Sequence, residues 1–175
     1  HQPFGDYYGT YRAMEEAYRA GKVRAIGVSN FSPNRFIDLQ YFVDIKPAIN
    51  QIETHVFQQQ KEAKKYLEKY NCQIESWGPF AEGKNDFFNT PLLKEIGEKY
   101  GKSVAQVALR FLLQSDVIVI PKSVRKERMQ ENFDIFDFEL TEDEMKSIEG
   151  LDQGSTLFHN HQEPETAERF LSFLS

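Results

Sequence analysis

The sequence predicts an α/β fold with parallel strands, because short apolar segments alternate along the chain with longer segments of helical periodicity. A second observation narrows the class: all four predicted strands carry polar residues at or near their C-terminal ends. Barrel enzymes build their sites around that rim, whereas an open doubly wound sheet binds its ligand at one crevice. Polar residues on four consecutive strand ends therefore favour a (β/α)8 TIM barrel over the doubly wound sheet.

The length and composition indicate one domain from a reducing compartment. The 175 residues can bury a substantial core, and a net charge of -6 with a pI near 5.3 argues against a nucleic-acid binder or a polybasic membrane-surface protein. Cys72 is the only cysteine, which excludes an intrachain disulfide. The sequence shows neither a membrane-spanning stretch nor a signal-peptide pattern, so we expect a soluble cytoplasmic protein with residues 1–175 in a single domain.

The first half of the chain predicts three strands separated by helices. A helix over residues 7–20 ends at Gly21, a favourable residue after a helix C-terminus, and a strand follows over residues 23–28. Ser32 has the form of an N-cap, with Pro33 at the first position of a helix that extends to about residue 43. The next predicted elements are a strand over 47–53, a helix over 58–70 and a strand over 72–77.

The second half predicts mainly helices around one further strand. A loop over residues 80–89 is followed by a helix over 91–100, and Ser103 caps the helix after it. The β-branched run 117–120 predicts a buried strand, and Thr141-Glu142-Asp143-Glu144 has the form of a capping box. The last helix of this half ends at Gly150, and the tail over 151–175 is polar and irregular until about residue 167.

The turn between the last predicted strand and its helix predicts an anion site. Pro121 ends the strand, since proline cannot donate to a ladder, and a helix N-terminus with free N–H groups follows. Lys122 supplies a point charge, Ser123 a hydroxyl and Arg128 a planar fork suited to phosphate. The alternative is a solvated cationic face balanced by Glu127 and Glu131. No GxGxxG stands beside the turn, so it is not the usual dinucleotide-binding turn.

The order of residues in this turn, Pro-Lys-Ser, then Arg, then Glu-Asn, resembles the cofactor segment of the aldo-keto reductase family. Further segments resemble this family, and in particular its bacterial diketogluconate-reductase-like members, in order and spacing over nearly the whole chain. Four segments resemble the fifth, sixth, seventh and eighth strands of the family's barrel. In that order they are Gly21–Phe31, Ile49–Glu53, Glu75–Phe80 and Ile120–Ser123. The resemblance implies that this chain supplies about strands 5–8 with their helices and the C-terminal tail, and that the N-terminal part of the barrel is absent from it.

The resemblance also implies an NADP site and assigns its residues. The basic and hydroxyl residues Lys122, Ser123 and Arg128 would hold the 2′-phosphate, with Glu131 and Asn132 facing the adenine. Ser29, Asn30 and Gln51 would hold the nicotinamide carboxamide, and Trp77 would stack on the nicotinamide ring, where many relatives have tyrosine. The alternatives are a simple turn pair for Ser29-Asn30, a surface amide for Gln51 and a core residue for Trp77.

His1 resembles one of the family's four catalytic residues, because His1-Gln2-Pro3 matches the His-x-Pro string that ends the fourth strand. An accident of the chain start is the alternative. The family's catalytic Asp, Tyr and Lys lie on strands that would precede His1, and a full barrel takes about 250 residues. The resemblance therefore implies NADPH-dependent reduction of an aldehyde or ketone to an alcohol, with this chain alone inactive. The alternative function is that of a non-catalytic nucleotide-binding barrel that serves as a sensor or an assembly subunit.

The sequence also leads to expectations for the tail, for one loop and for two single residues. His159-Asn160-His161 lacks the further ligands of a metal site, so we expect an ordinary polar tail and no metal. By resemblance the tail folds over the barrel mouth, with Phe158, Phe170 and Phe173 as apolar contacts, and Lys84 is the cation of a loop that closes over the pyrophosphate. Cys72 is expected to be a buried inert thiol, and His55 a rim residue to which the sequence assigns no role. A small carbonyl substrate is the expected partner, without nucleic acid or membrane.

Overall fold

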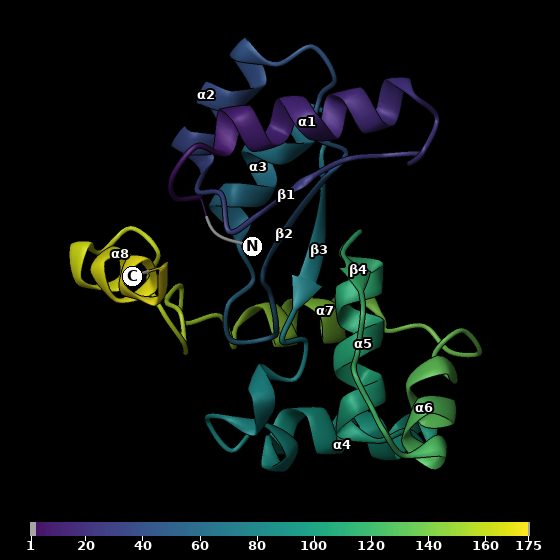
Figure 1. Cartoon of the computed structure of the whole chain (residues 1–175). Helices are drawn as coiled ribbons and strands as arrows, with labels where there is room; N and C mark the ends of the chain where they lie inside the picture. The colour runs from purple at the N-terminus through teal and green to yellow at the C-terminus, as the bar shows by residue number, and fades with distance from the viewer. Residues whose placement is uncertain (1–2, 175) are drawn as a thin grey trace. The chain divides into compact units, whose positions relative to one another are not determined.

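The computed structural model describes residues 3–174, which form two compact units. The first unit takes its residues from the ranges 1–52, 61–74 and 158–175, and the second from 53–60 and 75–157. The chain thus passes between the two units several times. Figure 1 shows the helices and strands, coloured in chain order. Most contacts within the described part of the chain therefore fall into two groups.

The strands are β1 (Val28–Ser29), β2 (Ile49–Glu53), β3 (Gln73–Trp77) and β4 (Ile118–Val119), and they are hydrogen-bonded in chain order. The pairs β1–β2 and β3–β4 are parallel, which confirms the predicted sheet. The strands predicted over 23–28 and 117–120 are each reduced to two residues.

Gly27 illustrates how closely the backbones approach beside β1. A Cβ atom built on Gly27 would lie 2.5 Å from the Ile49 carbonyl oxygen, so no larger side chain fits there without a shift of the backbone. The Ala48 N–H donates to the Ile26 carbonyl over 2.8 Å and continues the pairing before β1 begins. Glycine at this position therefore allows the two chain segments to lie in register.

The first unit contains the helices α1 (Tyr7–Arg19), α2 (Pro33–Phe42), α3 (Lys61–Lys69) and α8 (Pro164–Leu171), and the short η3 (Ser172–Leu174). Its core includes Tyr11, Phe36 and Leu39, with 1% or less of each residue exposed. The helix predicted over 58–70 begins later, at Lys61, because Gln58 forms a bridge with His55 and Gln60 adopts a positive φ of 56°. The tail helix begins at Pro164, earlier than predicted, since proline is well suited to a first helical turn.

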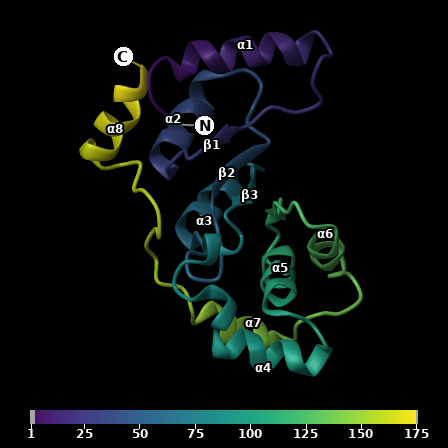
Figure 2. The same cartoon turned by 60° about the horizontal axis from the view of Figure 1, so that its bottom comes forward.

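The second unit contains η1 (Ala81–Gly83), η2 (Phe87–Asn89), α4 (Pro91–Tyr100), α5 (Val104–Gln114), α6 (Lys126–Phe133) and α7 (Glu142–Glu149). The helix α5 contacts both α4 and α6 (Figure 2). Its residues from 106 to 112 are all buried. Ser103 and Gln106 form a capping box at the start of α5. The capping box predicted for Thr141 and Glu144 is confirmed at the start of α7.

Several smaller expectations can be compared with the described residues. Cys72 is 3% exposed, which confirms its burial, and burial raises the pKa of its thiol to about 12, as is typical of an unreactive cysteine. Within residues 3–174 no group of three or more potential ligands could hold a metal ion. The rings of His159 and His161 pack against Phe170 instead, each with centroids 5.8 Å apart. No helix in the described part of the chain is long and apolar enough to cross a membrane.

Candidate functional site

The turn from β4 to α6 lies in the second unit and is shaped by Ser123. The Ser123 hydroxyl accepts a hydrogen bond from the Arg125 N–H over 3.2 Å and lies 3.3 Å from the Arg125 carbonyl, to which it can donate. The Arg125 carbonyl also accepts the first hydrogen bond of α6, from the Met129 N–H. The first N–H groups of α6 therefore have no partner within the helix, and the positive end of the helix dipole lies at this turn.

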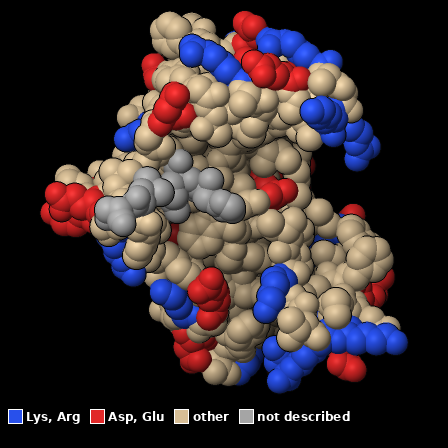
Figure 3. Space-filling model, viewed as in Figure 1, with Lys and Arg blue, Asp and Glu red and all other residues tan. Residues whose placement is uncertain are grey.

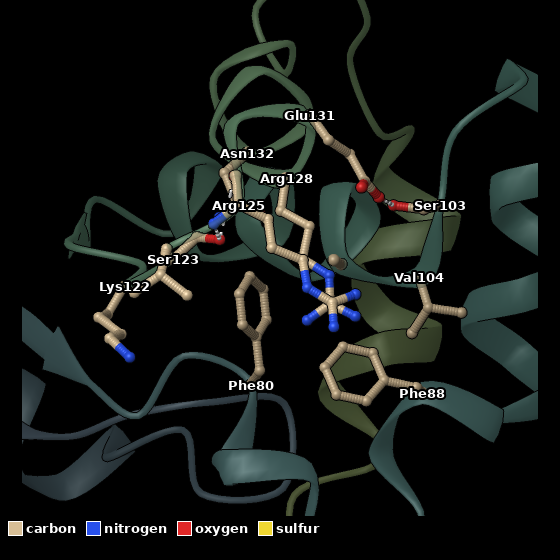
Figure 4. A pocket seen from close by; sticks show the side chains of 12 residues that line it. Phe80, Phe88, Ser103, Val104, Lys122, Ser123, Arg125, Arg128, Glu131 and Asn132 are labelled. Carbon is tan, nitrogen blue, oxygen red and sulfur yellow. Dashed lines mark hydrogen bonds between the residues drawn. The ribbon is translucent and has the colours of Figure 1, made fainter.

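A pocket of about 520 Å³ opens at this turn. Its walls come from three parts of the second unit: the loop after β3, the start of α5 and the β4–α6 turn with α6 itself (Figure 4). The structure thus brings five of the predicted cofactor residues to one pocket. They are Lys122, Ser123, Arg128, Glu131 and Asn132, joined on the opposite wall by Phe80, Phe88, Ser103, Val104 and Ala105.

The basic side chains of this pocket lack acidic partners. Within residues 3–174, the side chains of Lys122, Arg125 and Arg128 form no ion pair or hydrogen bond. Elsewhere in the same unit basic residues are paired, as with Lys102, whose Nζ lies 2.8 Å from Asp134 and 2.7 Å from Asp137. All three side chains are exposed, so they are accessible to a bound anion, and Figure 3 shows basic side chains in the region of α6.

Glu131 is oriented by a neighbouring helix. Its carboxylate accepts a hydrogen bond from the hydroxyl of Ser103, the N-cap residue of α5 (Figure 4). The same hydroxyl accepts from the Gln106 N–H over 3.3 Å. Ser103 therefore links the start of α5 to α6 and fixes a carboxylate at the wall of the pocket, a role that the sequence analysis did not assign to it.

The predicted carboxamide residues gather at the C-terminal ends of β1 and β2, in the first unit. Ser29 and Gln51 are paired in the register, and the Ser29 hydroxyl donates to the Gln51 carbonyl over 2.9 Å. The Asn30 N–H donates to the same carbonyl over 2.9 Å, with Asn30 at a positive φ of 58°. The Ser29 oxygen can still accept a hydrogen bond, as a bound amide would require.

Trp77 ends β3 and is neither fully buried nor fully exposed. Its carbonyl accepts from the Thr54 N–H over 3.3 Å, which fixes the strand end. Lys84 donates to the Leu157 carbonyl over 3.1 Å. His1, the predicted catalytic residue, lies outside the described residues.

His55 follows the C-terminal end of β2, where a rim residue was expected, and its side chain is completely buried. Its Nε2 lies 3.0 Å from Glu53 Oε1, and its Nδ1 accepts from the Phe57 N–H over 3.2 Å. The Glu53 carboxylate also accepts hydrogen bonds from the hydroxyl of Thr156 and the N–H of Leu157. The spacing of two residues between Glu53 and His55 was the available signal, since it places both side chains on one face of an extended segment.

The pKa of Glu53 reflects a competition between burial and hydrogen bonding. Burial alone would raise this pKa, because it disfavours the charged carboxylate. The hydrogen bonds from His55, Thr156 and the Leu157 N–H stabilise the charged form and outweigh burial, so the pKa lies below its usual value. Glu53 is therefore a buried, ionised and fully hydrogen-bonded group at neutral pH.

Comparison with known proteins identifies a family whose members have a parallel sheet of this kind. The sequence model described as the aldo/keto reductase family matches residues 1–153, which is most of the chain. The chain belongs to the aldo/keto reductase family. Its fold matches the later part of aldo-keto reductase TIM barrels, which confirms the fold class and the family resemblance.

Three individual proteins show the extent of the similarity. Glyoxal reductase of Bacillus subtilis (strain 168) is 43% identical over 93% of this chain and 59% of its own length. A solved structure provisionally assigned as a 2,5-diketo-D-gluconic acid reductase B superposes with a TM-score of 0.85 at 37% identity, covering 94% of this chain and 60% of that one. A Gox0644 variant in complex with NADPH gives a TM-score of 0.79 at 38% identity, over 84% and 54% of the two chains. The chain thus spans little more than half the length of these relatives.

Proposed function

We propose that this aldo/keto reductase chain binds NADPH and contributes to an enzyme that reduces an aldehyde or ketone to an alcohol. The observation that carries the proposal is the pocket at the β4–α6 turn, where Lys122, Arg125 and Arg128 lack acidic partners among residues 3–174. A phosphomonoester supplies the negative charge and the acceptor oxygens that such a pocket requires. The similar Gox0644 variant was solved with NADPH, and a Bacillus subtilis relative is a glyoxal reductase, which supports the same cofactor and a carbonyl substrate.

In this proposal, different residues of the chain bind different parts of NADPH. Lys122 and Arg128 would hold the 2′-phosphate by charge, with Ser123 as a hydroxyl partner, and Glu131 and Asn132 would face the adenine. Ser29, Asn30 and Gln51 would hold the carboxamide, and the ring of Trp77 would support one face of the nicotinamide. These roles follow the family resemblance.

Bound NADPH supplies the hydride for carbonyl reduction. His1 would orient the substrate, and reduction also needs a placed acid that protonates the carbonyl oxygen. By resemblance that acid is a tyrosine, supported by a lysine and an aspartate, on strands outside the part of the family that this chain matches. We therefore propose that the 175-residue polypeptide alone binds the nucleotide without turnover.

Calorimetric titration with adenosine 2′,5′-bisphosphate tests the phosphate assignment directly, because this ligand presents the adenine and the 2′-phosphate without the nicotinamide. We expect it to bind at least about tenfold more tightly than ADP, since one charge-assisted contact contributes about 1.5–3 kcal/mol. Equal affinities for the two ligands would refute the proposed cofactor. Binding without turnover in a longer, barrel-forming protein would instead favour the non-catalytic sensor or assembly subunit.

A further inference from the structure

The segment over residues 53–60, here called the buried loop, begins at the last residue of β2, belongs to the second unit and is mostly buried. Thr54 is 1% exposed and His55 and Val56 are 0% exposed, although two of these residues are polar. Connecting loops usually lie on the surface, because buried polar groups require internal partners. None of the residues in this loop has a part in the proposed chemistry, so its burial needs another explanation.

Glu53 uses both carboxylate oxygens to hold one end of a distant segment. Its Oε1 accepts from the Leu157 N–H over 2.9 Å, and its Oε2 accepts from the Thr156 hydroxyl. His55 fixes the orientation of this carboxylate through the contact of 3.0 Å at Nε2. Because His55 Nδ1 accepts from the Phe57 N–H, the proton of the neutral ring is on Nε2 and points to Glu53.

The other end of the same segment is held as well. The Gln59 N–H donates to Asp152 Oδ1 over 3.1 Å, and the Gln153 N–H donates to the Phe57 carbonyl over 2.8 Å. Residues 152–157, here called the clasp segment, are therefore bound to the buried loop at both ends. About a hundred residues of chain separate the two partners, so these contacts are purely tertiary.

Two connections lead from the buried loop and the clasp segment to the wall of the anion pocket. The first is polar: Lys84, in the loop after β3, donates to the Leu157 carbonyl over 3.1 Å. The second is aromatic: Phe57 packs edge-on against Phe87, with centroids 5.8 Å apart and Phe87 fully buried. Phe87 in turn contacts Phe80 and Phe88, which line the pocket (Figure 4).

We propose that Glu53 is a positioning residue for the nucleotide pocket: through Thr156 and Leu157 it holds the clasp segment, and the clasp segment with Phe57 holds the loop that carries Phe80 and Phe88. This inference rests on the proposed function for the identity of the ligand, an adenosine bearing a 2′-phosphate. Glu53 does not touch the ligand in this scheme. Its ionised form keeps the pocket wall in the geometry that binds.

Thr156→Val tests the proposal, because it removes one hydrogen bond to Glu53 and preserves the shape of the side chain. We expect faster amide hydrogen exchange in residues 80–89 and 153–157, with exchange in α5 unchanged. We also expect about fivefold weaker binding of adenosine 2′,5′-bisphosphate by calorimetry, a coupling of ordinary size. Thr156→Ser keeps the hydroxyl and should restore both properties, and Thr10→Val, an exposed threonine of α1, serves as the matched control.

The outcomes separate this inference from the proposed function. Unchanged exchange in residues 80–89 of Thr156→Val, unchanged affinity despite faster exchange, or failure of Thr156→Ser to restore both would each refute the positioning role. If the unmodified protein does not bind adenosine 2′,5′-bisphosphate at all, the proposed function fails. In that case, amide hydrogen exchange in the unmodified protein and in Thr156→Val still shows whether Glu53 and Thr156 hold residues 80–89 in place.

Discussion

At the scale of single residues, Arg128 is expected to separate NADPH from NADH. Its guanidinium has no partner among residues 3–174 and lines the pocket assigned to the 2′-phosphate, a group that NADH lacks. Arg128→Ala should weaken NADPH at least about tenfold and leave NADH nearly unchanged, since a charge-assisted contact contributes about 1.5–3 kcal/mol. Calorimetry with both cofactors measures the effect. Arg12→Ala, on an exposed position of α1, is the matched control, and equal losses for both cofactors would contradict the assignment.

Glu53 is expected to make stability depend on pH. Its folded pKa lies below the ordinary value of 4.5, so its contribution is fully present above that pH and is lost as the pH falls through the folded pKa. Stability should therefore rise with pH over the acidic range. Urea unfolding between about pH 3 and pH 7 measures this slope, which should be shallower in Glu53→Gln because that side chain does not titrate. An identical slope in both proteins would mean that other groups control the acid sensitivity.

The sequence indicated the site residues that are close together along the chain, but not those that only the tertiary fold brings together. Lys122, Ser123 and Arg128 lie within seven positions of each other, so a local turn is enough to bring them together. Glu53 and Thr156 are 103 positions apart, and only the tertiary fold makes them neighbours. A lone Thr in a polar tail carries no signal of such a contact.

At the scale of elements, the helices α2 and α7 both follow a Ser or Thr at the N-cap position. We expect loss of that side chain to lower the stability of the protein more at α7 than at α2. Thr141 accepts from the Glu144 N–H over 3.2 Å, whereas Ser32 makes no capping bond to the backbone and contacts Asn34 instead. Thr141→Ala should lower the free energy of unfolding by about 1 kcal/mol, and Ser32→Ala by only a few tenths (~0.3 kcal/mol). Chemical denaturation of both variants measures the difference, and equal losses would show that the Ser32 cap forms in solution.

The same pair shows how far element prediction reaches. Both helices were predicted to begin within one residue of where they do, because the proline at position 33 and the Thr-x-x-Glu pattern restrict the backbone locally. The strands were less well predicted: the apolar run 23–28 contributes only Val28 to β1. Strand length depends on a hydrogen-bonded neighbour, which in this case is β2, and a run of β-forming residues does not specify that neighbour.

At the scale of the whole molecule, the class of fold followed from the alternation of segments, and the barrel followed from where the polar residues fall on the strands. The family resemblance supplied the position within the barrel. The division into two groups of contacts was not predicted, because it depends on how β2 and β3 are shared between the units. The periodicity of apolar residues predicts each helix or strand separately and does not indicate which unit its residues contact.

The final prediction is that the 175-residue polypeptide alone does not reduce carbonyls at an enzymatic rate. In the described sheet β1 and β4 are the outer strands, and four parallel strands do not close a ring. Apolar side chains beside β4 are also exposed, with Ile120 at 48% and Val124 at 79%. Such edges favour pairing with another chain rather than formation of a rigid site.

The chemistry leads to the same expectation independently, because hydride transfer leaves an alkoxide that needs a placed acid, and general acid catalysis contributes about 10²–10⁴-fold. The assay follows NADPH absorbance with a panel of aldehydes, beside a family member that contains the complete barrel. We expect nucleotide binding without measurable oxidation. Turnover within about tenfold of the complete barrel would show that the polypeptide supplies its own acid, and it would contradict both the geometric and the chemical argument.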